Sequence, residues 1–388
     1  MASLLGRHDL LAVSFVSFIM IGLPSGALGT AWPSMRQSFG RSVSSLVWVL
    51  LILRLGRLLW SLGSGWLSTR IGWGKAAVAA AAVSTVGLLI YAGSPHWWTL
   101  LVGALLVGAG DAGIDAALNV NVALNHGPRA MGLMHGFFGV GATLGPLLVI
   151  SALALDASWR FVYLVMAVAR GALMISLWSR HSEFDRMPAA VKPVAKAPEH
   201  RSRLGLTLSF FFLVTGIEVT LGQWAFSFFT EARGMGHTAA GLVVAAFFIA
   251  LTGGRFLLGG VGHRWGPVVL LRWAAPGVLV TTTLMWANPA PSLGLIGFVA
   301  SGLALSSMFP SLMTLTPHWM GVEQTGLAIG YQMAAGSVGA VAIPGVVGLF
   351  ADAHGLEVLG PWVTGAAVAL VAVEYWSRRP IGALRPAS

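Results

Sequence analysis

The sequence contains no cysteine among its 388 residues, and only 9% of its residues are charged. The absence of cysteine excludes disulfides and thiolate metal sites, so redox chemistry gives no information about the compartment. Soluble domains carry about 25% charged residues, and this chain has too few charges to cover a water-facing surface. The remaining class is a chain whose outer surface faces lipid, where apolar side chains need no polar cover.

Basic residues are more numerous than acidic ones, and the formal net charge is +10. A nucleic-acid-binding surface would gather them in one patch among stacking aromatic residues. Here they lie in short gaps between apolar segments, where positive charge sets the topology of a membrane protein. The sequence therefore predicts membrane lipid, and not nucleic acid, as a partner.

Twelve segments are long and apolar enough to span a bilayer, which takes about 20 residues. They cover residues 10–34, 45–68, 76–94, 97–125, 131–155, 159–180, 205–230, 239–262, 267–287, 291–316, 324–350 and 359–377. Strands of a membrane β-barrel would be about 10 residues long with strict alternation, whereas these runs are apolar on all sides. The first is also too long for the apolar core of a signal peptide, about 7–15 residues. We therefore predict an all-α membrane protein with twelve transmembrane helices.

The polar stretch 181–204 separates six of these segments from the other six, and it cannot bury enough apolar area to fold alone. The predicted organisation is an N-terminal six-helix bundle at 1–180, a cytoplasmic linker at 181–204 and a C-terminal six-helix bundle at 205–388. With the N-terminus inside, fifteen Lys and Arg residues fall in the cytoplasm and four outside. This bias predicts a cell (inner) membrane protein with both termini in the cytoplasm.

The two predicted bundles resemble each other in the placement of their glycines. When the first half is shifted by 194 residues, eleven of its glycines coincide with glycines of the second half, several times more than random placement gives. The pairs include Gly22/Gly216, Gly40/Gly234, Gly72/Gly266, Gly108/Gly302 and Gly145/Gly339. Duplicated six-helix halves with a substrate site near the midplane are a known transporter architecture.

The segment between the second and third predicted helices resembles a signature of the major facilitator superfamily. It reads GWLSTRIGWGK at 65–75, and GGVGHRWG at 259–266 echoes it in the second half. The resemblance implies a gating role for Gly65, Arg70, Gly72, Lys75, Arg264 and Gly266. The signature aspartate is Thr69 here. Because that acid helps to latch the cytoplasmic gate in the family, the latch is expected to be weaker or built otherwise.

Three helices resemble the fucose-permease-like branch of this superfamily, which includes proton-coupled hexose importers. Its fourth helix has glycines, an acid, and an asparagine four residues later, and residues 108–119 here read GAGDAGIDAALN. LMHGFFGVGATLGP at 133–146 and GIEVTLGQW at 216–224 are similar to this branch as well. The resemblance implies a monomeric secondary transporter without a cofactor. The second coupling acid of the fucose permease, in helix 1, is missing.

Three acidic residues lie deep inside predicted spans: Asp111, Asp115 and Glu218. A charge at the bilayer centre costs about 2.5 to more than 10 kcal/mol, so each must face a wet cavity, a partner or a proton. Asp111, Asp115 and Asn119 follow at four-residue intervals, which places them on one helix face. Two carboxylates one turn apart repel each other, which favours a proton on one of them. We predict proton coupling at Asp115, with Asp111 and Glu218 as further candidates.

Four arginines also fall inside predicted spans: Arg54, Arg57, Arg170 and Arg255. If Asp115 is structural instead, Arg54 or Arg57 is its expected partner. Arg255 is expected to be structural. Alternatively, Arg54 binds an anionic substrate, which would contradict a sugar as the substrate.

The predicted substrate-binding residues are polar or aromatic side chains inside the spans: Asn119, His135, Gln223, Trp224, Tyr331 and Gln332. His135 matches the position of a sugar-contacting glutamine in the fucose permease. It either bonds a hydroxyl or belongs to the cytoplasmic gate. Trp224 either stacks on sugar C–H groups or anchors the helix at the membrane interface.

The leading functional hypothesis is import of a small polar solute such as a sugar, coupled to protons by alternating access. Proton-driven efflux of an amphipathic compound is the closest alternative. Gly141-x-x-x-Gly145-Pro146 resembles an antiporter motif of drug-efflux relatives, but close helix packing explains these glycines without efflux. A sensor that does not transport is a further alternative. The sequence has no metal-spaced histidines, nucleophile motif or phosphate loop that would predict an enzyme.

Overall fold

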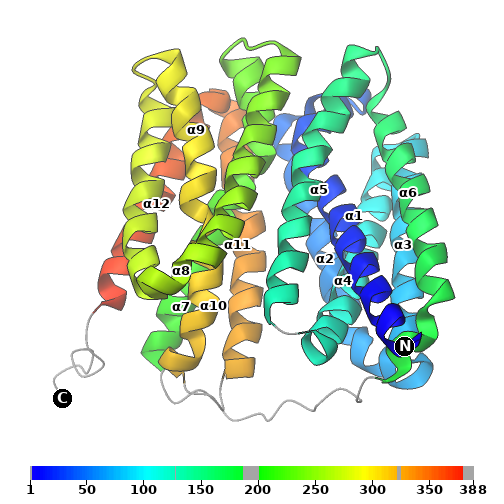
Figure 1. The fold of residues 1–388 in the computed structure, drawn as a ribbon. Helices are drawn as coiled ribbons and strands as arrows, with labels where there is room; N and C mark the ends of the chain where they lie inside the picture. Colours follow the sequence, from blue (N-terminus) through cyan, green and yellow to red (C-terminus); the bar gives the residue numbers. More distant parts are fainter. Residues whose placement is uncertain (1, 127, 187–200, 321–324, 379–388) are drawn as a thin grey trace. The chain divides into compact units, whose positions relative to one another are not determined.

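The computed structural model describes residues 2–126, 128–186, 201–320 and 325–378, which form a helical protein (Figure 1). The helices of the first half are α1 (Ala2–Ser38), α2 (Leu46–Ile71), α3 (Trp73–Gly93), α4 (Trp97–Asn125), α5 (Pro128–Ala154) and α6 (Trp159–Ser179), with short helices η1 (Val43–Ser45) and η2 (His181–Arg186). Those of the second half are α7 (Arg201–Ser227), the π-helix η3 (Phe228–Ala232), α8 (His237–Ala287), α9 (Pro291–Ser306), α10 (Met308–Met320), α11 (Thr325–His354), η4 (Leu356–Val358) and α12 (Leu359–Ser377).

Twelve stretches of the described helices are long and apolar enough to cross a membrane, which confirms the predicted fold class. In the second half, the helix numbers do not correspond one to one with the spans. Helix α8 holds both the eighth and the ninth span, and α9 with α10 forms the tenth. Helix α8 is broken at Gly266, whose φ of 73° and ψ of 156° are not helical.

The repeated glycines occupy the same backbone positions in both halves. Gly40 and Gly234, which follow the first and seventh spans, have φ values of 58° and 64°. Gly72 directly precedes the third span and Gly266 is the second residue of the ninth, with φ of 82° and 73° and ψ of 159° and 156°. This last region is essentially restricted to glycine, because a Cβ would clash with the backbone. The repeat in the sequence therefore has a counterpart in the main chain.

Replacing Gly266 should strain this break. We expect Gly266→Ala to lower the free energy of unfolding by about 1–3 kcal/mol, the cost of an L-residue in such a conformation. Gly63→Ala in α2 is the control, because an added Cβ there meets no heavy atom within 4 Å and alanine favours the helix. Thermal unfolding of both variants in one detergent measures the difference. Equal midpoints for Gly266→Ala and the parent protein would contradict the strain argument.

Glycines also bring helices of each half into backbone contact. A Cβ on Gly22 in α1 would lie 2.1 Å from the carbonyl oxygen of Phe138 in α5. In the second half, a Cβ on Gly339 in α11 would lie 2.1 Å from that of Phe212 in α7. Small residues permit this approach in membranes, where helix association depends on van der Waals packing. The first and fifth spans of each half are thus joined in the same way.

The antiporter-like motif serves the same contact. A Cβ on Gly141 would lie 2.1 Å from the carbonyl oxygen of Ile19, and one on Gly145 would lie 2.5 Å from that of Leu23. Both carbonyls belong to α1. The motif therefore packs α5 on α1, as expected from close packing.

The chain divides into two compact units, residues 1–191 with 236–245, and residues 192–235 with 246–388. In the first unit α1 packs on α5, α2 and α3 pack on α4, and α3 also packs on α6. In the second unit α7 packs on α11 and α12. The first residues of α8 group with the first unit.

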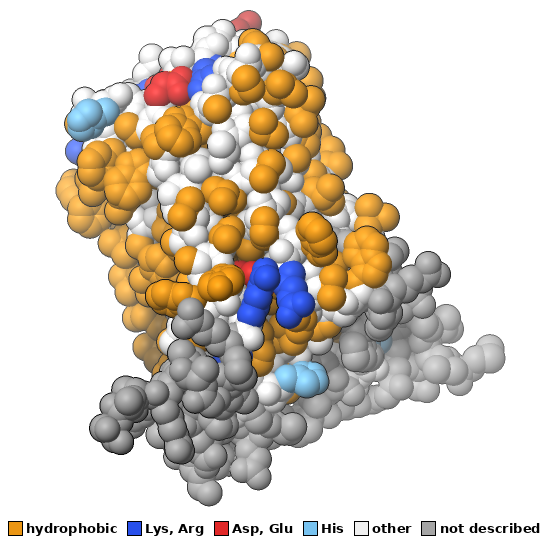
Figure 2. All heavy atoms as spheres, turned by 90° about the vertical axis from the view of Figure 1, so that its left-hand side faces the viewer, with side chains coloured by type: hydrophobic (Ala, Val, Ile, Leu, Met, Phe, Trp, Pro, Cys, Tyr) orange, Lys and Arg blue, Asp and Glu red, His pale blue; other side chains and the backbone are white. Residues whose placement is uncertain are grey.

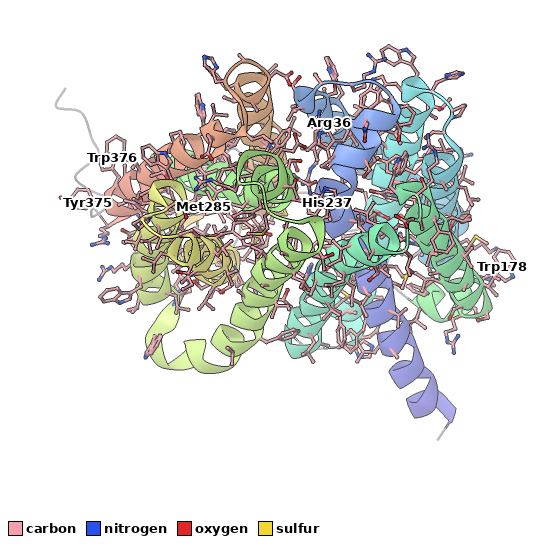
Figure 3. The ribbon with its side chains drawn as sticks, turned by 90° about the horizontal axis from the view of Figure 1, so that it is seen from above. Arg36, Trp178, His237, Met285, Tyr375 and Trp376 are labelled. Atoms are coloured by element: carbon pink, nitrogen blue, oxygen red, sulfur yellow. The ribbon has the colours of Figure 1, made fainter. Side chains whose placement is uncertain are left out.

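Apolar side chains cover much of the described surface. In Figure 2, hydrophobic side chains spread over the described face, while charged ones gather near its upper edge and in its lower part. Leu62 and Trp273 are 74% and 76% exposed, an arrangement that only lipid stabilises. In Figure 3, Trp178 near the end of α6 and Trp376 near the end of α12 lie at the outer rims of their units. Tryptophans at span ends are typical of membrane–water interfaces.

Candidate ion-coupling and solute site

Three arginine–carboxylate pairs lie inside the spans of the described chain. They are Arg170–Asp111 and Arg57–Asp115 in the first unit and Arg255–Glu218 in the second. Each of the three acids that the sequence singled out therefore has an arginine partner. The pairs differ in how far their side chains are exposed.

Asp111 belongs to a fully packed ion pair between α4 and α6. Its Oδ1 accepts hydrogen bonds from Nη1 of Arg170 at 2.5 Å and from the hydroxyl of Ser84 in α3 at 2.8 Å. Arg170 also donates to Ser84 at 3.1 Å and to the carbonyl oxygen of Met20 in α1. The side chains of Arg170 and Asp111 are 1% and 7% exposed. This network joins four helices and has the features of a structural core.

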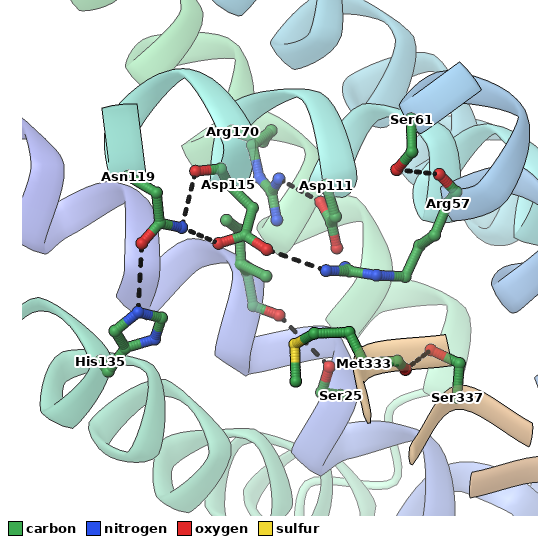
Figure 4. Close-up of polar contacts among 11 residues, drawn as sticks. Ser25, Arg57, Ser61, Asp111, Asp115, Asn119, His135, Arg170, Met333 and Ser337 are labelled. Carbon is green, nitrogen blue, oxygen red and sulfur yellow. Dashed lines mark hydrogen bonds and ion pairs between the residues drawn. The ribbon is translucent and has the colours of Figure 1, made fainter. Parts of the chain in front are cut away.

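Asp115 belongs to an open chain of polar groups across α2, α4 and α5 (Figure 4). Nη2 of Arg57 donates to its Oδ2 at 3.0 Å, and Nδ2 of Asn119 donates to its Oδ1 at 2.7 Å. The Oδ1 of Asn119 lies 3.1 Å from Nε2 of His135, whose ring meets Phe18 edge-on at 5.1 Å. Arg57 and Asp115 are 33% and 29% exposed, so this pair is open on one side.

The sequence pattern placed Asp111 and Asp115 on one face, and the structure adds the neighbour of each. Positions four apart differ by about 40° around a helix, which is enough for one side chain to reach α6 and the other α2. Each carboxylate is therefore balanced by its own guanidinium. Arg57 was one of two expected partners for Asp115. The roles of Arg170 and Ser84 were missed, although an arginine inside the sixth span was a visible signal.

Glu218 pairs with Arg255 in the second unit. Nη2 of Arg255 in α8 donates to both carboxylate oxygens of Glu218 in α7, at 3.1 and 3.0 Å. The two side chains are 23% or less exposed, between the values of the other two pairs. The arginine expected to be structural is thus the counter-ion of a predicted proton carrier.

The remaining predicted substrate residues lie in different surroundings. Trp224 is completely buried, and its indole N–H donates to the carbonyl oxygen of Pro344 in α11 at 3.0 Å. Gln223 is 7% exposed. Gln332 is buried and its Oε1 accepts from Thr316 in α10 at 3.1 Å, whereas its neighbour Tyr331 is 46% exposed. In this conformation the ring of Trp224 has no exposed face.

The signature segment at 65–75 and its echo at 259–266 are partly described. Arg70 lies over the ring of Trp66 at 4.6 Å, Lys75 is exposed, and Gly72 and Gly266 have the restricted backbone noted above. The contacts of Gly65, Thr69 and Arg264 lie outside what the structure describes. A Cβ on Gly74 would lie 2.0 Å from the carbonyl oxygen of His181, so η2 packs directly on the start of α3.

The described chain has twelve apolar spans, two halves whose glycines match, and charged pairs inside the spans. Together these features define a polytopic membrane protein of the transporter class. The sequence profile of the Major Facilitator Superfamily matches residues 13–287 and 206–386. The chain belongs to this superfamily, as the signature at 65–75 predicted.

Known proteins with similar sequences or folds include sugar and nucleoside transporters. Bypass of stop codon protein 6 of Saccharomyces cerevisiae is 24% identical over 94% of this chain and 81% of its own length. A glucose/galactose transporter of Brucella abortus is 28% identical over 76% of each chain. The crystal structure of a mutant of the nucleoside transporter NupG matches with a TM-score of 0.75 at 12% identity, covering 96% of this chain and all of the other. The last comparison shows the fold.

Proposed function

We propose that this transporter carries a small polar solute such as a sugar together with protons by alternating access, and that Asp115 carries the proton. The observation that supports this most directly is the half-open chain Arg57–Asp115–Asn119–His135. A carboxylate inside a membrane is stable while a guanidinium compensates it. A proton arriving from an open side neutralises the carboxylate and weakens its bond to Arg57.

Asn119 and His135 supply the groups that a hydroxylated solute needs. Both reach the same polar chain as Asp115, and His135 is an exposed side chain. A hydroxyl that bonds one of them would replace part of the Asn119–Asp115 contact, so solute and proton affect the same carboxylate. The name of the Brucella relative supports a sugar. We further propose an inner-membrane monomer with cytoplasmic termini and two six-helix halves, 1–180 and 205–388.

Transport in liposomes tests this proposal. The full chain is reconstituted with a pH-sensitive dye inside, and hexoses, pentoses, sugar acids and amphipathic cations are added in turn. We expect internal acidification with a sugar and loss of that signal to background in Asp115→Asn. Asp156→Asn is the control, because Asp156 is an exposed carboxylate in a loop.

Other results contradict the proposal in distinct ways. A proton signal only with amphipathic cations would assign efflux. A sugar signal that survives in Asp115→Asn would remove the proton from this residue. No signal with any compound, from folded protein, would contradict sugar symport.

A further inference from the structure

Two of the intramembrane arginines, Arg170 and Arg255, use their guanidinium groups differently. Arg170 is buried and donates from both Nη atoms to a carboxylate, a hydroxyl and a carbonyl. Arg255 makes both of its hydrogen bonds from Nη2 alone. Within the described residues, its Nε and Nη1 thus keep their donors for another acceptor. A guanidinium presents these donors as a rigid fork that matches a carboxylate bidentately.

The surroundings of Arg255 leave room for such an acceptor. Arg255 and Glu218 are 21% and 23% exposed although both lie inside spans. A Cβ on Gly254 would lie 2.3 Å from the hydroxyl oxygen of Ser306, so α8 touches α9 beside the arginine. Arg255 therefore lies on a helix with a close neighbour, while about one fifth of its own side chain is exposed.

We infer that Arg255 binds the carboxylate of an anionic solute, and that Glu218 is the internal carboxylate that occupies this arginine when the solute is absent. The inference rests on the proposed transport function and narrows its solute to one with an acidic group, such as a sugar acid. When the solute carboxylate reaches Arg255, Glu218 loses its partner and takes up one proton. At this pair one anion and one proton then enter together, in addition to the proton proposed for Asp115, and the net charge of the pair is unchanged.

Arg255 is the charged group that the described structure places against Glu218. The other titratable groups on helices packed against α7 are Glu231 in η3, His318 in α10, Tyr331, Asp352 and His354 in α11, and Glu374 and Tyr375 in α12. His318 lies 3.3 Å from the carbonyl oxygen of Thr314, and Glu374 is paired with Arg378 at 2.6 Å. Asp352 and His354 lie in the last turn of α11. The pH dependence of anion binding is therefore assigned to Glu218.

Binding of matched ligands to the full-length purified protein tests the inference. The probes are glucuronate and glucose, gluconate and sorbitol, and lactate and glycerol, each an acid beside a neutral relative. We expect at least one acid to bind about tenfold more tightly than its neutral relative at pH 5.5, and its affinity to fall by up to about tenfold for each pH unit as the pH is raised. Ligand-induced thermal stabilisation provides the affinities.

Two variants locate the effect. Arg255→Gln should bind acid and neutral relative equally, whereas Glu218→Gln should keep the preference for the acid and lose its pH dependence. Arg272→Gln is the control, because Arg272 is an exposed arginine of the same unit. If Glu218→Gln is too unstable to purify, acetate is added to it. Acetate should raise its melting temperature, and should not raise that of the Glu218→Gln/Arg255→Gln double variant.

The inference and the proposed function fail in different ways. Equal affinity for acids and neutral relatives in the parent protein, or no binding of any acid, would overturn the inference. So would an acid preference that survives in Arg255→Gln. Acid binding without any uptake into liposomes would leave the Arg255 site intact and contradict transport.

Discussion

Arg170→Met is expected to lower the free energy of unfolding by about 3–5 kcal/mol, because it leaves Asp111 ionised and buried without a counter-ion. Asp111 is 5% exposed, and Ser84 alone would remain as its hydrogen-bond donor. For a protein of this size we expect the melting temperature to fall by about 5 °C. Heating the detergent-solubilised protein, followed by size-exclusion chromatography of the folded fraction, measures this.

Two further variants show whether the loss comes from the unpaired charge. Arg272→Met removes an exposed arginine and should leave the melting temperature unchanged. Arg170→Met/Asp111→Leu removes both charges, and it should recover most of the stability because apolar replacements of buried ion pairs are often neutral or stabilising. A double variant as unstable as Arg170→Met alone would contradict this account.

The helices and their order followed from the sequence because bilayer thickness fixes span length. The predicted segments 97–125 and 159–180 compare with spans Trp97–Val122 and Trp159–Ser179. The sequence also marks the glycines that have positive φ, because Gly72 and Gly266 recur 194 residues apart, each before an apolar run. Such features depend on local chemistry, which a single sequence records.

The sequence predicted the partners of the charged residues less well than it predicted the helices. Asp111 and Asp115 differ little in local pattern, yet one contacts Arg170 in α6 and the other Arg57 in α2. That choice depends on which helices surround α4. Trp224 is a comparable case, because its ring suits a sugar, an interface and a core equally well, and its partner Pro344 lies 120 residues away.

Exchanging Arg57 and Asp115 should restore stability without restoring proton-coupled transport. The single variants R57D and D115R each leave uncompensated charge inside the spans. Since the native side chains are about one third exposed, we expect each to lose about 2–3 kcal/mol, the low end of the cost of an intramembrane charge. In R57D/D115R the two charges face each other again. Its melting temperature should approach that of the parent protein.

Transport by R57D/D115R then separates a proton carrier from a structural ion pair. An arginine at position 115 stays charged at every physiological pH, so it cannot release and take up a proton during the cycle. It also presents donors to Nδ2 of Asn119, which donates to Asp115 in the native protein at 2.7 Å, so the polar chain to His135 is interrupted. Proton-coupled uptake in liposomes should therefore stay at background despite the recovered stability. If uptake instead returned to within about twofold of the parent protein, an ion pair of either polarity would suffice and Asp115 would not be the proton carrier.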